Sequence, residues 1–396
     1  MTITGGTLFK GNFVLVFFSS MMLFTAFYLL MPTLPVYLTR ELRIDKGQTG
    51  LVLSIYTLAA LIIRPFTGYL IDRYSRKAFY IPAFLLFALI FTGYPLAGTL
   101  GLMLIVRFAH GVVWGVATTT GSTLIVDIIP ADRRGEGIGL YGLAMTIPMA
   151  LGPFIGLQLT HYQNYSHLFI FAAVLAFTGF LLTVFIRYPV VSHSHKSHFS
   201  WRNLIETSSL PVTFNLLLIN SSYGGLVSFI SLYAIETGIG HTGIFFIVFA
   251  SGIAVARIYG GKIFDRQGPM AISVTGIVLL MAAYSSLGLN ISIFGFLLAA
   301  ALAGLGSGVI FPIFQAMVNN MVSPKRRGAA NSTLFTGLDL GIGIGMVATG
   351  LSAHEIGLPN TYLVFVLING IALAFFLLVT LKHYRNHLST NKDNIK

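Results

Sequence analysis

The chain has 396 residues, of which 55% are hydrophobic and only 9% are charged. Soluble proteins carry about a quarter of their residues as charges, so this composition excludes an ordinary soluble domain and indicates a membrane protein. The formal charge of +12 raises the question of nucleic acid, and the absence of cysteine excludes disulfides and thiol chemistry.

Apolar runs of about 20 residues, each long enough to cross a bilayer as a helix, recur along the whole chain. The first run is too long for a cleavable signal peptide and lacks a small-residue cleavage pattern, so we expect it to be a span. We predict an all-α integral membrane fold of twelve transmembrane helices, at 12–37, 48–71, 78–97, 99–126, 136–159, 165–187, 209–234, 241–263, 270–289, 291–321, 326–352 and 357–382.

Lys and Arg are distributed unevenly over the loops between these spans. Of the 24, eighteen fall on the side of the N-terminus, three on the opposite side and three within spans. An excess of Lys and Arg in cytoplasmic loops is the positive-inside rule. The basic charge therefore sets the topology and indicates no nucleic-acid partner. Both termini should be cytoplasmic, and we expect a plasma membrane, the inner membrane in a bacterium.

The two halves of the chain repeat at a constant offset of 193 residues. The offset maps Arg64 to Arg257 and Asp72 to Asp265, and it also relates five glycines to glycines, Gly115 to Gly308 among them. Six spans are an even number of crossings, so the halves share one orientation. We predict two six-helix bundles, 1–187 and 209–396, joined by a polar cytoplasmic linker, 188–208. The linker histidines have no acid or cysteine beside them, so we expect no metal site.

Charged residues gather in two related loops, "GYLIDRYSRKA" at 68–78 and "GKIFDRQG" at 261–268. The first resembles the signature loop of the major facilitator superfamily, and the second resembles its degenerate second copy. With twelve spans, a central linker and the duplication, the resemblance covers the whole chain. It implies two pseudo-symmetric bundles that expose a central site alternately to either side, and it points to the drug and sugar efflux branch.

We interpret these loops as a cytoplasmic latch between the halves. Gly68 should allow a close helix contact, and Asp72 can face the positive N-terminal end of another helix. The resemblance implies that this is the helix that begins near Arg327. Asp127 is the nearest spare anion for a loop arginine. The alternative is that the charges only enforce topology, which Lys and Arg alone would do. The latch candidates are Gly68, Asp72, Arg73, Arg76, Lys77, Asp127, Asp265 and Arg266.

The span 99–126 contains Arg107, which is costly to bury in a membrane and is therefore a functional candidate. With Gly111 and Gly115 it resembles the superfamily motif that is tied to proton transfer in proton-driven members. His110 lies three residues later on the same helix face, and histidine changes its charge near neutral pH. A titrating role and a packing role both remain open for His110.

The span 136–159 contains Gly152, Pro153 and Gly156, which resemble the G-P-x-x-G element of antiporters in the superfamily. Proline kinks a helix and glycine allows close packing. The family pattern ends in a glycine pair, whereas this chain has Leu157 after Gly156. The partial match favours export.

Asp339 is the one acid deep within a span, about 18 Å along the helix from Arg327. A carboxylate there needs a cation or a proton. Arg64, in the span 48–71, is the candidate partner. A structural Asp339–Arg64 pair and a carboxyl that exchanges its proton during transport are compatible hypotheses.

The resulting prediction is a secondary active transporter that exports a small organic or amphiphilic compound in exchange for protons. An uptake symporter for a sugar, peptide or organic anion is the first alternative, and a non-transporting membrane sensor the second. We expect no enzyme activity, no metal, no cofactor beyond the proton gradient, and a monomer in the lipid bilayer. The fold that the resemblance implies lines its cavity with the first, fourth, seventh and tenth spans, and the candidates there are Tyr28, Trp114, Asn220, Tyr223, Phe311 and Gln315.

Overall fold

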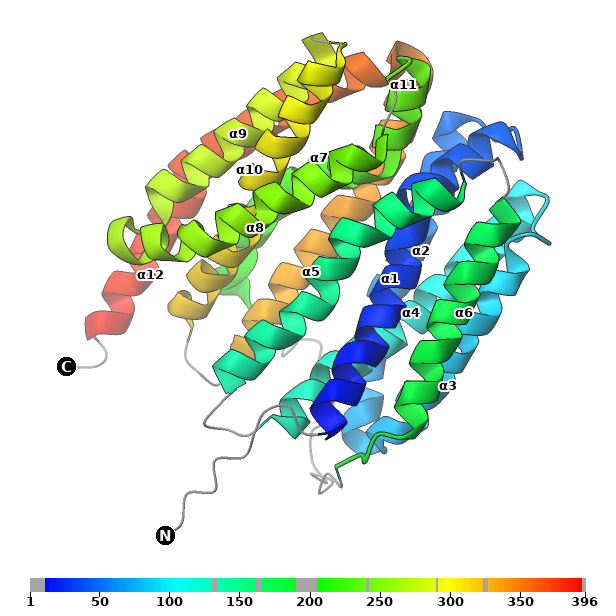
Figure 1. The fold of residues 1–396 in the computed structure, drawn as a ribbon. Coiled ribbons are helices and arrows are strands. Elements are labelled where there is room, and N and C mark those ends of the chain that lie inside the picture. The colour runs from blue at the N-terminus through cyan, green and yellow to red at the C-terminus, as the bar shows by residue number, and fades with distance from the viewer. Residues whose placement is uncertain are drawn as a thin grey trace. The chain divides into compact units, whose positions relative to one another are not determined.

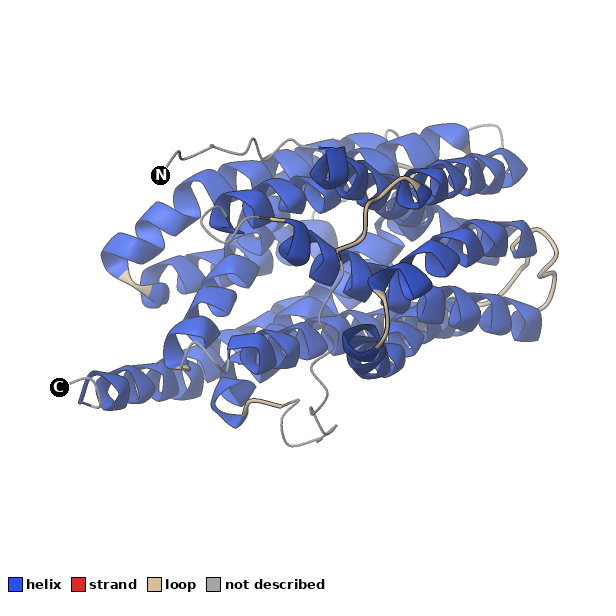
Figure 2. Ribbon diagram, turned by 90° about the horizontal axis from the view of Figure 1, so that it is seen from below, coloured by secondary structure: helices blue, strands red, loops and turns tan. Residues whose placement is uncertain are grey.

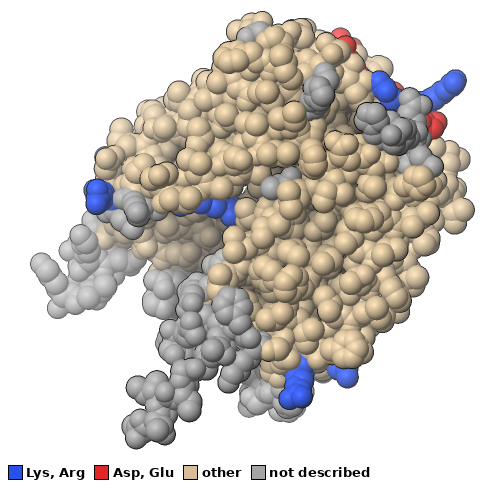
Figure 3. Space-filling view, in the orientation of Figure 1, with Lys and Arg blue, Asp and Glu red and all other residues tan. Residues whose placement is uncertain are grey.

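The computed structural model describes residues 11–129, 134–160, 165–189, 205–239, 242–289, 291–322 and 327–393. Over these ranges the regular secondary structure is entirely helical (Figure 1, Figure 2). Large apolar side chains are exposed along the helices, with Leu289 at 76% and Phe294 at 70%. On the face drawn in Figure 3, charged side chains are few and other residues cover almost all of the surface. Such a surface suits lipid as the solvent.

The helices follow the chain in a simple order. Their bounds are α1 Gly11–Arg40, α2 Lys46–Arg73, α3 Arg76–Ile90, η1 Phe91–Gly93, α4 Leu100–Ile128, α5 Arg134–Leu159, α6 Tyr165–Val184, η4 Thr207–Ser209, α7 Leu210–Glu236, α8 Thr242–Gln267, α9 Pro269–Leu289, α10 Ile293–Met321, α11 Arg327–Phe375, η6 Phe376–Thr380 and α12 Leu381–Asp393.

Within the described ranges, eleven helices are long and apolar enough to cross a membrane. One of them, Ala329–Leu388, has 60 residues, far more than a single crossing needs. It bends at Gly357, whose φ of 78° and ψ of 161° are not helical, and Pro359 follows. The run therefore holds two spans, as the predicted helices 326–352 and 357–382 require, and the fold contains the twelve predicted crossings. The other spans begin and end within four residues of their predicted bounds, except that α3 ends at Ile90, seven residues before the predicted end at 97.

The chain divides into two compact units, which differ from the predicted bundles at one place. The first unit is Met1–Tyr37 with Leu58–Phe199, and the second is Leu38–Thr57 with Ser200–Lys396. The end of α1 and the first part of α2 thus belong to the unit of the C-terminal helices. Most of the predicted linker, 190–204, lies outside the described residues.

In the first unit, α3 packs against α4 and α6 (Figure 1). Tyr80 of α3 is fully buried, and its hydroxyl lies 3.3 Å from the hydroxyls of both Ser19 and Ser20 on α1. Ser20 also hydrogen-bonds Tyr141 of α5 at 2.9 Å. Interhelical hydrogen bonds of this kind are worth about 0.6–2 kcal/mol each in a membrane, so this network fixes three helices at one end of the unit.

In the second unit, α11 packs along α7, and α10 packs against α8 and α9. The α7–α11 contact depends on glycines spaced four residues apart on α11, at Gly337, Gly341 and Gly345. A Cβ at any of them would collide with α7, for example with the backbone of Ser221 opposite Gly345. The two helix backbones touch here because glycine has no side chain, as is common between helices in lipid.

The duplication is visible in how corresponding helices begin. Thr99 caps α4 through its hydroxyl, which accepts a hydrogen bond from the Leu102 amide at 3.3 Å. Ser292 caps α10 in the same way, with the Gly295 amide at 3.0 Å. Both the caps and the amides are related by the 193-residue offset, so the repeat found in sequence is also a repeat of local structure.

Helix packing repeats at the same offset. A Cβ on Gly115 of α4 would lie 2.9 Å from the carbonyl oxygen of Ala60 on α2. A Cβ on Gly308 of α10 would lie 3.0 Å from the carbonyl oxygen of Ile253 on α8. Residues 60 and 253 are again 193 apart. Each unit therefore contains the same glycine-mediated crossing of its second and fourth spans.

Candidate functional site

A buried polar centre lies in the first unit, formed by Arg107 and His110 of α4 and by Tyr94, which precedes α4. Arg107 is 5% exposed, His110 2% and Tyr94 0%. Nη1 of Arg107 donates a hydrogen bond to the Tyr94 hydroxyl at 3.3 Å, and that hydroxyl lies 2.9 Å from Nδ1 of His110. Tyr94 thus links a fixed cation to a side chain that can gain and lose a proton.

Aromatic rings enclose this centre. The His110 ring lies 4.2 Å from that of Phe87 and 4.7 Å from that of Phe91, measured between centroids. Tyr94 stacks on Phe169 of α6 at 5.2 Å. The rings exclude water and hold the polar groups in one arrangement. The sequence indicated Arg107 and His110 but not Tyr94, because Tyr94 fell at the end of a predicted span, whereas the helix gives way to η1 at Phe91.

Two of the cavity candidates, Trp114 and Tyr28, also lie in the first unit. Trp114 is 7% exposed and stacks on Phe27 of α1 at 4.4 Å. Tyr28 is half-buried and lies where α5 crosses α1, since a Cβ on Gly152 would be 2.7 Å from the Tyr28 Cβ. Gly156 meets the backbone of Leu29 one turn later. The glycines of the predicted kink element therefore bring α5 into backbone contact with α1.

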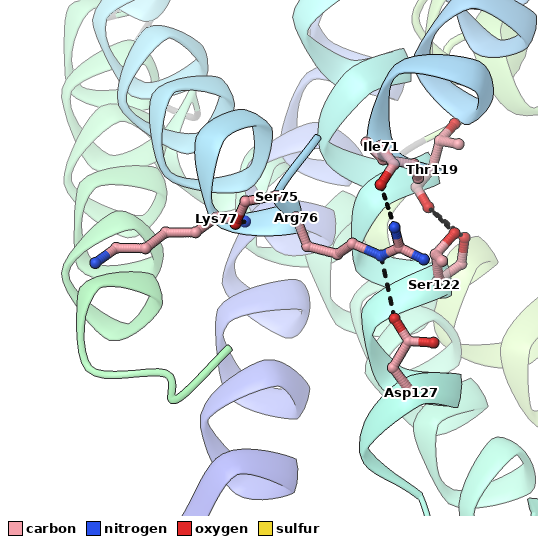
Figure 4. Close-up of polar contacts among 8 residues, drawn as sticks. Ile71, Ser75, Arg76, Lys77, Thr119, Ser122 and Asp127 are labelled. Atoms are coloured by element: carbon pink, nitrogen blue, oxygen red, sulfur yellow. Dashed lines mark hydrogen bonds and ion pairs between the residues drawn. The ribbon is translucent and has the colours of Figure 1, made fainter. Parts of the chain in front are cut away.

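At the junction of α2 and α3, Arg76 is buried and its Nε lies 3.2 Å from Oδ2 of Asp127 at the end of α4 (Figure 4). Its Nη1 donates to the backbone oxygen of Ile71. The ion pair therefore joins α2, α3 and α4 inside the first unit. Lys77, the next residue, is exposed and its side chain points away from the ion pair (Figure 4).

The remaining latch candidates divide into two groups. A Cβ on Gly68 would meet nothing within 4 Å, so the close helix contact expected there is not found among the described residues. Arg266 is exposed in the last turn of α8. The side chains of Asp72, Arg73 and Asp265 lie outside the described part. The latch between the halves stays a prediction.

Asp339 is half-buried on a face of α11 that carries residues 332, 336, 339, 343, 346 and 350 at alternating spacings of four and three. Such spacing keeps side chains on one helix face. We call this face the α11 seam. Arg64, also half-buried, belongs to the first unit and Asp339 to the second, so their pairing stays a prediction.

The first part of α2 covers one end of the α11 seam. A Cβ on Gly50 would lie 2.5 Å from the Met346 carbonyl oxygen and 3.3 Å from the Cα of Gly350. The two backbones therefore touch. At the same end, Nζ of Lys46 lies 2.8 Å from Oε1 of Glu236 at the end of α7. These contacts explain why the first part of α2 belongs to the second unit.

The other cavity candidates lie in the second unit. Asn220 donates to the Leu216 oxygen of its own helix at 2.9 Å, and Tyr223 lies 6.2 Å from Phe249 between ring centroids. Phe311 and Gln315 lie one turn apart on α10 and both contact α11. Phe311 packs on Phe335 at 5.3 Å, and Gln315 hydrogen-bonds Asn331. Sequence reasoning missed the α11 partners, although an Asn and a Phe four residues apart signal one helix face.

The comparisons with known proteins agree on one family. The sequence model of the Major Facilitator Superfamily matches residues 16–290 and 242–394. An uncharacterised transporter of this superfamily from Methanocaldococcus jannaschii is 24% identical over 345 residues, which cover 84% of this chain and 88% of the relative. The staphylopine export protein of Staphylococcus aureus is also 24% identical, over 342 residues that cover 81% of this chain and 85% of that protein.

Solved structures show the same fold. The nucleoside transporter NupG superimposes with a TM-score of 0.76 at 15% identity and covers 93% of this chain and 100% of its own. A bacterial homologue of the human lysosomal transporter Spinster, in an inward-facing and occupied conformation, gives a TM-score of 0.77 at 15% identity, covering 94% of this chain and 97% of its own. The matched family and these neighbours are transporters and not enzymes.

Proposed function

Because this chain belongs to the Major Facilitator Superfamily, we propose that it is a secondary active transporter that exports a small organic or amphiphilic compound in exchange for protons. The site that would bind the compound lies between helices that alternate their exposure to the two sides of the membrane. The N-terminus is cytoplasmic in this proposal, as the distribution of Lys and Arg predicts.

The division of α2 between the two units is the main support for the proposed transport cycle. Its residues up to Thr57 belong to the second unit and those from Leu58 to the first. For the first part of α2 to move away from α7 and α11 during transport, the contact of Gly50 with Met346 and the Lys46–Glu236 ion pair must break. With a cytoplasmic N-terminus, this end faces outward, and the contact closes the outer side.

Asp339 supports the proton-coupled part of the proposal. It lies on the α11 seam, beyond the part that α2 covers, and a carboxyl in a membrane span is stable only when it is protonated or paired with a cation. Loss of its proton on one side and gain on the other would couple proton entry to export. The Arg107–Tyr94–His110 centre is the second proton candidate.

The direction of transport is supported by α5 and by one relative. Gly152 and Gly156 place α5 in backbone contact with α1, and the element resembles that of antiporters in the superfamily. The Staphylococcus aureus relative is an export protein by name. Export is therefore the direction we propose for this chain.

The test is counterflow in proteoliposomes under an imposed pH gradient, with a compound found by thermal-shift screening of the purified protein. The proposal predicts that protons moving into the lumen drive the compound out of it. Compound uptake driven by inward protons would identify a symporter and contradict the export proposal. Asp339→Asn should abolish the effect of the pH gradient, whereas Glu355→Gln, which alters an exposed carboxyl of the same helix, should not.

A further inference from the structure

Three carboxamides form a hydrogen-bonded group where the end of α10 meets the beginning of α11. Nε2 of Gln315 donates to Oδ1 of Asn331 at 3.1 Å, and Nδ2 of Asn331 donates to Oδ1 of Asn319 at 2.8 Å. Nδ2 of Asn319 donates to the backbone oxygen of Gln315 at 2.8 Å. We call Gln315, Asn319 and Asn331 the amide cluster. All three are half-buried, so the cluster is fixed in place and remains accessible.

Gln315 has hydrogen-bonding capacity left over. Its Nε2 carries two hydrogens, of which the bond to Asn331 uses one, and its Oε1 accepts no hydrogen bond from any described residue. The side chain lies about 9 Å from the end of α10 at Met321, within the depth of a membrane span. It therefore presents one donor and one acceptor side by side, with no formal charge.

An aromatic pair lies one helical turn from the amide cluster. Phe311 precedes Gln315 by four residues on α10, and Phe335 follows Asn331 by four residues on α11. Their ring centroids are 5.3 Å apart, and Phe335 is 39% exposed. One turn is about 5.4 Å, so a flat apolar surface and a hydrogen-bonding group lie within the length of one small aromatic molecule.

This part of the second unit is unsuited to lipid. Ser332 and Thr336, beside Asn331, are exposed on the α11 seam. Further along the same face, a Cβ on Gly343 would lie 3.7 Å from Thr57 of α2. The seam is thus the face of α11 that meets α2, and polar side chains in a span face other helices or a water-filled cavity. Beyond the contact with α2, the seam continues with polar residues toward the amide cluster.

The cluster is also a departure from the internal repeat. The positions that correspond to Gln315, Asn319 and Asn331 in the first half are Ser122, Val126 and Ile138. The packing glycines Gly115 and Gly308, by contrast, are the same in both halves. A feature needed only to hold the fourth and fifth spans of each half together would serve both halves. The amides therefore serve a purpose that only the second half has.

We propose that the amide cluster and the Phe311–Phe335 pair bind an uncharged aromatic compound that carries a carboxamide or hydroxyl group. The ring lies against the phenylalanines, and the polar group donates to Oε1 of Gln315 and accepts from its Nε2. A charged group at this place would give up its hydration shell and gain only contacts with neutral amides, which is unfavourable in a low-dielectric site. The inference rests on the proposed transport function and names the chemical class of its substrate.

The test uses two probes and two variants in purified full-length protein in lipid nanodiscs, with binding measured by equilibrium dialysis. Chloramphenicol is uncharged and combines an aromatic ring with an amide and hydroxyls, whereas tetraphenylphosphonium has aromatic rings but no hydrogen-bonding group. Gln315→Leu removes the donor and acceptor at similar size. Asn320→Leu is the matched control, because Asn320 is an exposed amide of the same helix that bonds Tyr384 and not the cluster.

We expect Gln315→Leu to weaken chloramphenicol binding about tenfold, equivalent to about 1.4 kcal/mol. The melting temperature should stay unchanged, and any tetraphenylphosphonium binding should stay within twofold of wild type. Asn320→Leu should leave all three readouts unchanged. Failure of the wild-type protein to bind chloramphenicol, or equal weakening of binding in both variants, would overturn the proposal. So would a fall in melting temperature of Gln315→Leu that accounts for the loss.

The binding experiment and the counterflow experiment together separate this inference from the proposed direction of transport. Binding of chloramphenicol that depends on Gln315, together with counterflow that runs as symport, would support the binding site and reject the export proposal. Export of other compounds, with no chloramphenicol binding, would support the export proposal and reject the binding site.

Discussion

Replacing Gly50 by alanine should open the end of the molecule where α2 covers α11. The added Cβ would lie 2.5 Å from the Met346 carbonyl oxygen and 3.2 Å from the Cα of Val347, both backbone atoms that cannot rotate away. Ordinary carbon contacts begin at about 3.5 Å, so the two helices must separate locally by about 1 Å. Overpacking of this kind costs about 1–3 kcal/mol.

If that cost falls only on the closed arrangement, the equilibrium shifts toward the open arrangement by about 5- to 150-fold. The chain has no cysteine, so a single reporter, Leu53→Cys, can be labelled with a membrane-impermeant maleimide. Leu53 lies one turn after Gly50 on α2 and is 3% exposed. Labelling should therefore be slow in the reporter background and should rise by that factor when Gly50→Ala is added.

The matched control is Gly343→Ala, in the same seam, because a Cβ there would lie 3.7 Å from Thr57, an ordinary contact distance. It should leave labelling within twofold. Equal labelling in Gly50→Ala and Gly343→Ala would show that the α2–α11 contact does not limit access, and the reasoning about this end of α2 would be wrong.

Three further predictions concern the charged and polar groups of the spans. Asp339→Asn should remove the pH dependence of transport, measured as initial rate between pH 6 and pH 8, and a retained dependence would place the proton site elsewhere. Arg76→Ala should lower the melting temperature by several degrees, since it leaves Asp127 without this ion pair, whereas Lys77→Ala, exposed beside it, should not; equal melting temperatures would contradict the structural role of the pair. Tyr94→Phe should lower the free energy of unfolding of the first unit, measured with urea, by about 1–3 kcal/mol, because two hydrogen bonds of a fully buried hydroxyl are lost. A free energy of unfolding equal to that of wild type would contradict the structural role of Tyr94.

Hydropathy and repetition were sufficient to predict the fold. Twelve crossings followed from the length of the apolar runs, because lipid permits only helices there. The 193-residue offset recurs in the caps of α4 and α10, Thr99 and Ser292, and in the glycine crossings at Gly115 and Gly308. These features depend on the type of residue at each position, such as an apolar, capping or glycine residue, which can be read directly from the sequence.

The functional arrangement was less predictable, because it depends on side chains far apart in the sequence. Arg107 stood out as a charge in a span, but its partner Tyr94 is one of 17 tyrosines and precedes the helix. Gln315 was predicted as a cavity residue, and its partner Asn331 on the next helix was not. The assignment of the first part of α2 to the second unit depends on the contact of Gly50 with α11, which no sequence pattern marks.

The central claim, that two repeated bundles expose one site alternately, can be measured directly by electron–electron double resonance between spin labels. Leu96 and Leu289, exposed at 79% and 76%, are related by the repeat; Leu96 follows α3 and η1, and Leu289 is the last residue of α9. Tyr74 and Gln267, also exposed and also 193 residues apart, mark the opposite end. We predict two distance populations in each labelled pair, with the Leu96–Leu289 distance lengthening as the Tyr74–Gln267 distance shortens when pH or Asp339→Asn shifts the balance. Distances that stay single, or that change in the same direction at both ends, would contradict alternating access.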